Sequence, residues 1–372
     1  MEPDLKLIRE ANRRHPSWWG KASVTEPSSI IVESDALVLD INRVHETHRR
    51  WWIELNHGVV DRHGQLIEAL NDKRGDRHFF YPPTERLAAL RNRSVDSTEE
   101  ISKDFVLYGG TLFDHFGHLL LDLTRTYQLL RLFRDLDCPI WFHYHRLRKG
   151  GTIANRELIV AWLTCLGIHE RTRLVRRPIR AKTLVSSSVL YRDRCFVTRD
   201  FHDACLTALR PELRANLEAT HRKQKIAYLS RHKLITGTTK FLGELDVVNQ
   251  ISGLPNVDII CPEELSFEEK LALYRSYDWI IGFPQACMNL KAFVPSTPGN
   301  TPARQVMFLA GPKTLSTNWV NIDAACGFDD LYVDCHPQQD AGQHNTDDGF
   351  QRSNSFDVQT VVNTVRRLSA QG

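Results

Sequence analysis

From Phe105 to Val333, short apolar runs of strand length alternate with segments of helix length, and this alternation constrains the fold more than any other feature. Strands that alternate with helical patterns are typical of βαβ units and of parallel sheets covered by helices. The chain has 372 residues, which exceeds the usual size of one hydrophobic core. We therefore expect an α/β protein with two Rossmann-like domains that face a cleft, where the carboxyl ends of the strands bind ligands.

The charged stretch 221–225 marks the expected boundary, so the sequence predicts domains at 1–221 and 222–372. The expected strands are 29–39, 105–109, 139–144, 183–190, 226–230, 257–261, 279–281, 304–309 and 331–333. The expected helices are 116–134, 155–166, 201–220, 243–251, 266–276, 286–293 and 358–368. The tract 336–355 is rich in Gln, Asp, Asn and Gly, which predicts a mobile surface loop.

The composition excludes several classes of protein. A net charge of +3 is too small for a dedicated nucleic-acid binder. No run of about 18 apolar residues occurs, and residues 1–4 lack the apolar start of a signal peptide, so we expect a cytoplasmic protein. Peripheral membrane association stays open. The eight cysteines form no Cys-x-x-Cys pair, which favours buried, reduced thiols, and Cys335 and His336 lack the partner pair of a zinc site.

The most informative segment, 114–125, carries a polar stripe on an apolar helix. Wound as a helix, His115, His118, Asp122 and Arg125 share one face, because they follow i, i+3, i+7 and i+10 spacing. The rest of the helix surface is mostly leucine, which predicts a buried helix. The ionisable side chains of the stripe must then be paired with other groups or face a water-filled cleft. This pattern favours a functional site.

Two other interpretations of the stripe remain. It could be structural, with Asp114 as the helix N-cap and an internal pair of Asp122 with Arg125. It could also hold a metal through His115, His118 and Asp122, although further ligands are missing.

Two further segments fit an anion site. The strand 226–230 delivers Ser230 and Arg231 at its carboxyl end, where a guanidinium can donate two hydrogen bonds to a diphosphate, and Lys240 follows with a point charge. Alternatively, Arg231 is a solvated salt-bridge partner. The segment 280–289 joins a strand to a helix start through a glycine turn, so its backbone N–H groups could bind phosphate.

A tempting metal motif is rejected. Asp135-Leu136-Asp137 looks like an Asp-x-Asp metal clamp, but it follows a helix and precedes the strand 139–144, whereas a clamp needs to follow a strand. We interpret it as a loop, and we expect no metal.

In this order, these segments resemble the glycosyltransferase 61 family, which includes bacterial capsular-polysaccharide transferases, plant xylan-decorating enzymes and the EGF-domain O-GlcNAc transferase. The family shows an Asn-Tyr-Gly-His-x-Leu-Leu-Asp/Glu segment, which stands here as His-Phe-Gly-His-Leu-Leu-Leu-Asp at 115–122. It then shows a strand that ends in Ser-Arg, matched by Ser230 and Arg231. A later Asn-Glu is matched by Gly243 and Glu244.

The resemblance covers roughly 105–293. A stretch similar to Pro-Glu-x-Leu-Ser-Phe-x-Glu-Gln stands at 262–270, with Lys as its last residue. The chain then departs from the family after Gly282. It has Pro284 and Gln285 where the family has His and Gly, in the loop that contacts the donor, so the identity of the donor is not carried over.

The resemblance implies an inverting, metal-independent transferase of the two-domain GT-B type, acting in polysaccharide or capsule synthesis. Its partners would be a nucleotide-sugar co-substrate and a glycan or other hydroxyl acceptor, without a further cofactor. The domain 1–221 would hold the acceptor and the base, and 222–372 the donor. The candidate catalytic residues are His118, Asp122 and His115. The candidate donor-binding residues are Ser230, Arg231, Lys240, Gly282, Gln285 and Asn289.

Two alternatives stay open at this point. The chain could be a glycan-binding or scaffold protein with a degraded donor site, which donor binding and donor hydrolysis would test. It could also be a polysaccharide pyruvyl transferase, which would use phosphoenolpyruvate.

Overall fold

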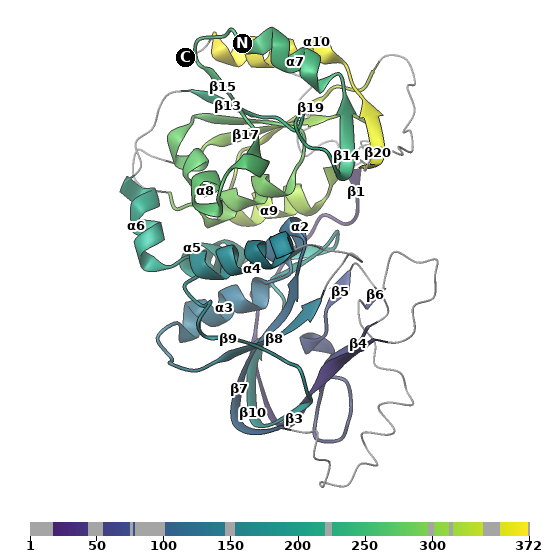
Figure 1. Cartoon of the computed structure of the whole chain (residues 1–372), viewed down its shortest axis with the longest axis vertical. Helices are drawn as coiled ribbons and strands as arrows, with labels where there is room; N and C mark the ends of the chain where they lie inside the picture. The colour runs from purple at the N-terminus through teal and green to yellow at the C-terminus, as the bar shows by residue number, and fades with distance from the viewer. Residues whose placement is uncertain are drawn as a thin grey trace. The chain divides into compact units, whose positions relative to one another are not determined.

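The computed structural model describes residues 18–43, 55–74, 77–78, 101–145, 153–219, 225–296, 301–311, 315–337 and 350–370. The chain forms two compact units. Unit 1 comprises Met1–Ala22 and Pro211–Gly372, and unit 2 comprises Ser23–Arg210. Both units pack helices against β-sheets, which confirms the α/β class (Figure 1). The predicted domains 1–221 and 222–372, and a cleft between them, stay predictions.

Unit 1 is built on a five-stranded parallel sheet in the order β15-β13-β16-β17-β19. Its strands are β13 (Ile226–Leu229), β15 (Val257–Ile260), β16 (Trp279–Gly282), β17 (Arg304–Leu309) and β19 (Leu331–Asp334). In chain order this is 2-1-3-4-5, the flavodoxin-like doubly wound arrangement. The order reverses between β13 and β16. Ligands of such sheets bind at the carboxyl ends of the strands on either side of that reversal.

Helices cover both faces of this sheet. Helices α7 (Glu244–Ile251) and α10 (Val358–Ser369) lie on one face, and α8 (Phe267–Ser276) and α9 (Asn318–Cys326) lie on the other (Figure 1). Valines and isoleucines of α7 and α10 pack on β13, β16 and β17 in one buried cluster. Burial of these branched side chains is the main stabilising contribution in a sheet of this kind.

The tract predicted as a mobile loop contains a strand. Residues 338–349 lie outside the described part, but β20 (Phe350–Ser355) pairs in parallel with β14 (Gly237–Leu242), so the loop prediction is wrong there. The pairing buries Ser353 and Asn354 despite their polarity. Unit 1 also contains β1 (Trp18–Trp19), α6 (Pro211–Ala219), η3 (Pro262–Glu264), η4 (Ala286–Phe293) and β18 (Leu315–Ser316).

Unit 2 has a six-stranded mixed sheet in the order β4-β3-β10-β7-β8-β9. Its strands are β3 (Ile30–Arg43), β4 (Leu55–Val60), β7 (Ile101–Phe113), β8 (Ile140–His145), β9 (Thr172–Leu174) and β10 (Ile179–Ser187). Strand β3 runs antiparallel to both of its neighbours, and the other pairs are parallel. Smaller elements are β2 (Val24–Thr25), η2 (Glu68–Leu70), β5 (Lys73–Arg74), β6 (Arg77–His78), β11 (Tyr191–Arg192) and β12 (Phe196–Thr198).

Two predicted long helices are each divided. The segment 116–134 forms α2 (Phe116–Leu121) and α3 (Thr124–Phe133), because the Tyr127 hydroxyl donates to Leu120 O at 2.6 Å and occupies a carbonyl that a continuous helix would use. The segment 201–220 forms α5 (Phe201–Ala208) and α6, since the residue before Pro211 disfavours helical backbone. Helix α4 spans Ile153–Cys165. Among the described residues, no helix is both long and apolar enough to cross a bilayer.

Candidate functional site

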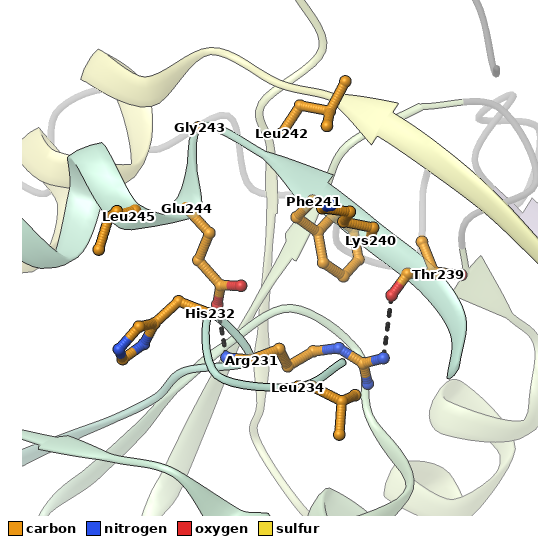
Figure 2. Close-up of a pocket in the computed structure, with 10 residues that line it drawn as sticks. All are labelled: Arg231, His232, Leu234, Thr239, Lys240, Phe241, Leu242, Gly243, Glu244 and Leu245. Atoms are coloured by element: carbon orange, nitrogen blue, oxygen red, sulfur yellow. Dashed lines mark hydrogen bonds between the residues drawn. The ribbon is translucent and has the colours of Figure 1, made fainter. Parts of the chain in front are cut away.

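Arg231 is the second residue after β13, at the reversal of strand order in unit 1. Its Nη2 donates to Thr239 O at 2.9 Å, and its guanidinium lies over the ring of Phe241, 6.0 Å from the ring centre (Figure 2). Burial lowers the pKa of Arg231 from its usual range, and the nearby Glu244 opposes that shift. The strand thus delivers a cation to the end of the sheet where a ligand is expected.

Arg231 lines a pocket of about 180 Å³ at this edge (Figure 2). The pocket is smaller than the roughly 300–1,000 Å³ of sites that hold a whole small molecule. It therefore suits a fragment such as a diphosphate. Its lining residues are Arg231, His232, Leu234, Thr239, Lys240, Phe241, Leu242, Gly243, Glu244 and Leu245.

Glu244 is the first residue of α7, and its carboxylate turns back toward the end of β13. It accepts a hydrogen bond from the backbone N–H of Arg231 at 2.9 Å and one from the Ser230 hydroxyl at 3.4 Å. Gly243 allows this return, because its φ of 95° lies in the left-handed region. Burial raises the pKa of Glu244 to about 7, although Arg231 works in the opposite direction.

Sequence reasoning placed Glu244 only within the family resemblance and gave it no role. An acidic residue in the first turn of a helix is ordinarily an exposed partner of the helix dipole. The resemblance at Gly243-Glu244 was the only signal that could have identified it. The hydrogen bond from Arg231 becomes visible only in the structure.

Ser230 and Lys240 occupy different environments near Arg231. Ser230 is fully buried, and its Oγ lies 2.7 Å from His232 Nδ1 as well as near Glu244, so it holds the turn together. Lys240 is exposed on β14 and lines the pocket. Ser230, Arg231 and Lys240 are therefore brought to one place, with Lys240 as the residue most open to solvent.

Gly282 and Gln285 connect β16 to β13. A Cβ on Gly282 would lie 2.8 Å from Leu229 O, so this glycine is required by the close approach of the two strands. Gln285 Nε2 donates to the same carbonyl at 3.0 Å. Asn289 is buried within η4 and donates to Ala286 O at 3.1 Å. These three residues shape the edge of the sheet, and none of them lines the pocket at Arg231.

His118 and Asp122 form the second candidate constellation, in unit 2. His118 Nδ1 lies 2.6 Å from Asp122 Oδ2, and both side chains are partly exposed, at 22% and 15%. The exposed His115 is the N-cap residue of α2, and its ring centre lies 5.2 Å from that of His118. The structure therefore brings the three candidate catalytic residues together. A carboxylate that holds Nδ1 keeps Nε2 of the imidazole as the proton acceptor.

The structural alternative for this stripe is wrong in its details. The N-cap of α2 is His115 rather than Asp114. Arg125 lies in the first turn of the next helix, α3, and its side chain turns inward. There it donates to Ala69 O and Ser187 O at 2.6 Å and pairs with Asp72 at 3.5 Å. The division of the helix separates Arg125 from the stripe.

Metal ligands do not gather in the part of the chain that the structure describes. No three His, Cys, Asp or Glu side chains come close enough to hold an ion there. All eight cysteines are free thiols, and five of them are buried: Cys165, Cys205, Cys261, Cys287 and Cys335. Asp135 and Asp137 lie exposed between α3 and β8, as predicted.

The family model of glycosyltransferase 61 matches residues 116–295. The chain carries a glycosyltransferase 61 domain. It is therefore a glycosyltransferase, as the sequence resemblance predicted. The match spans the His118–Asp122 pair as well as Arg231 and Glu244. A search of curated proteins finds no match to the chain.

Proposed function

We propose that this glycosyltransferase takes its sugar from a nucleotide-activated donor, whose diphosphate binds beside Arg231. The observation that carries the proposal is the position of Arg231 at the reversal of strand order, with its guanidinium at a pocket of about 180 Å³. The guanidinium gives one hydrogen bond to Thr239, while its planar fork can also donate to phosphate oxygens.

The leaving diphosphate gains negative charge as the sugar departs. Positive groups that are already in place stabilise this charge most where water is excluded. Arg231 supplies a partly buried positive charge, and Lys240 supplies an exposed one at the rim. The backbone N–H groups after Gly282 are the third group that we propose to stabilise the leaving diphosphate.

The base in this proposal is the His118–Asp122 pair. Asp122 holds Nδ1 of the imidazole, so Nε2 can take the proton of an acceptor hydroxyl while that oxygen attacks the sugar carbon. One direct displacement of this kind inverts the configuration at that carbon. A GT-B arrangement, a glycan acceptor, a role in capsule or other polysaccharide synthesis and a cytoplasmic location remain parts of the proposal.

Arg231→Ala is expected to weaken the binding of nucleoside diphosphates by tens-fold. The loss of a charge-assisted contact costs about 2 kcal/mol. Calorimetry with UDP, GDP, ADP, CDP and dTDP would measure the change. Arg304→Ala is the matched control, because Arg304 begins β17 at the opposite end of the parallel sheet. Equal affinity in wild type and Arg231→Ala would remove Arg231 from the donor site.

Sugar transfer is expected to proceed without a divalent metal. Arg231 and Lys240 supply the positive charge that a metal would otherwise bring to the diphosphate. Turnover in excess EDTA should equal turnover in magnesium, measured as release of the nucleoside diphosphate. Activity that disappears in EDTA and returns with manganese or magnesium would instead support the metal interpretation of His115, His118 and Asp122.

A further inference from the structure

Glu244 contacts the turn after β13 that contains Arg231. The transfer chemistry proposed above gives Glu244 no role. We propose that Glu244 is a positioning residue of the diphosphate site, which binds a proton when the diphosphate arrives and releases it when the diphosphate leaves. This inference rests on the proposed function, because it requires an anion beside Arg231. It concerns the chain's own carboxyl group and holds for any nucleotide base.

The geometry gives Glu244 a positioning role. Its side chain reaches from the start of α7 to the end of β13, where it accepts a hydrogen bond from Arg231 N–H (Figure 2). It also accepts one from the Ser230 hydroxyl. Ser230 is in turn bonded to His232. The residue is only 3% exposed. A carboxyl group in this position sets the direction in which the chain leaves β13, and therefore where the Arg231 side chain begins.

Charged groups approach Glu244 from several elements. Arg231 and His232 come from the turn after β13, and Lys240 comes from β14. Glu263 of η3 adds negative charge. Two buried groups also face it: Tyr228 of β13 and Cys261 at the end of β15. Arg231 is partly buried and interacts electrostatically with Glu244, whereas Lys240 is exposed to solvent, so Glu244 and a bound diphosphate would compete for the positive charge of Arg231.

This competition determines whether a proton on Glu244 strengthens or weakens the binding of the diphosphate. Two like charges in one buried site disfavour each other, so a bound diphosphate raises the pKa of a neighbouring carboxyl group. In the free protein, burial already raises the pKa of Glu244 to about 7. Protonation near neutral pH therefore costs little, and it leaves Arg231 with its full positive charge for the diphosphate. Because the protonated form binds more tightly, the affinity must fall as the pH rises through 7.

The experiment compares wild type with Glu244→Gln, which keeps the shape of the side chain and an acceptor oxygen but cannot ionise. Asp246→Asn is the matched control, since Asp246 is an exposed acid in the first turn of the same helix. Calorimetry with UDP, GDP, ADP, CDP and dTDP would be performed between about pH 6 and about pH 8. The phosphate of the nucleotide also titrates, near a pKa of about 6. His232, Lys240 and Glu263 stay in place, so the difference between wild type and Glu244→Gln isolates Glu244.

We expect the affinity of wild type to fall about tenfold more than that of Glu244→Gln over this range, since one coupled proton changes affinity by at most tenfold per pH unit. At about pH 8, Glu244→Gln should bind more tightly than wild type, and Asp246→Asn should follow wild type. Parallel pH profiles, or an equal loss of affinity in Glu244→Gln at every pH, would overturn the inference.

Two further outcomes separate this inference from the proposed function. If no nucleoside diphosphate binds wild type, or if Arg231→Ala binds it with unchanged affinity, the proposed donor site is wrong. If Glu244→Gln does not fold, the test uses wild type without that variant. Calorimetry in two buffers of different ionisation enthalpy then gives the number of protons that are taken up or released when the nucleoside diphosphate binds. Net proton uptake on binding above about pH 7 that persists in His232→Gln supports the inference, because this variant removes the imidazole that also lines the pocket and a nucleotide phosphate that meets cations loses protons. Net release contradicts it.

Discussion

Replacing His118 with alanine is expected to abolish most sugar transfer while donor binding survives. The imidazole is held by Asp122 at 2.6 Å and lies in unit 2, whereas the proposed donor contacts lie in unit 1. Removal of a general base costs about a hundred- to ten-thousand-fold in rate. Asp122→Asn should have a similar effect, since an amide does not stabilise an imidazolium as a carboxylate does. The measurement is turnover at saturating donor, with the donor dissociation constant beside it.

His169→Ala provides the matched control for this prediction. His169 also pairs with a carboxylate, Glu170 at 3.1 Å, but this pair is exposed on the surface of unit 2. Its loss should leave turnover unchanged. If His118→Ala instead lowered the melting temperature sharply, and the folded remainder transferred sugar at the normal rate, the pair would be a structural contact of α2.

Lys291→Met is expected to cause the largest loss of stability. Lys291 of η4 forms an ion pair with Asp330 just before β19, and both side chains are almost completely buried, at 4% and 0% exposure. Asp330 also accepts from Gln305 N–H at 2.8 Å. Removal of one partner leaves the other charge buried without compensation, which costs about 3–5 kcal/mol. Thermal unfolding should show a decrease in melting temperature on the order of 10 °C.

The same substitution at Lys233 tests whether burial is the cause. Lys233 pairs with Glu264 at 2.9 Å, but both side chains are about half exposed, so solvent screens the pair. Lys233→Met should therefore change the melting temperature little. A small effect of Lys291→Met, similar to that of Lys233→Met, would mean that Asp330 is neutralised in another way.

The parallel sheet of unit 1 was predictable because each of its strands is a short apolar run between helical segments. Arg231 could be placed at the end of a strand for the same reason. The division of the helix at Asp122 could not be predicted in this way, since it depends on the Tyr127 hydroxyl, which reaches a carbonyl about two turns behind it. An apolar periodicity continues through such a break without any sign of it.

Elements whose structure depends on distant partners were also missed. The strand β20 has the polar sequence Phe-Gln-Arg-Ser-Asn-Ser, which resembles a loop, and it exists because β14 lies beside it. Glu244 resembles a solvated helix start, and its burial follows from the return of the chain at Gly243. Local pattern cannot report on contacts of this kind, because the partner lies elsewhere in the chain.

Unit 2 is a continuous segment inserted into unit 1, and this has a consequence for how the protein is made. The N-terminal strand β1 pairs with β18, and Lys21 O accepts a hydrogen bond from Asn321 of α9. On the ribosome, all of unit 2 emerges before either partner has been synthesised. Unit 2 can therefore fold first, while β1, on its amino-terminal side, still lacks its pairing strand β18. Unit 1 closes only after synthesis has passed α9, so a ribosome that stalls within unit 1 would leave one finished body and one open sheet.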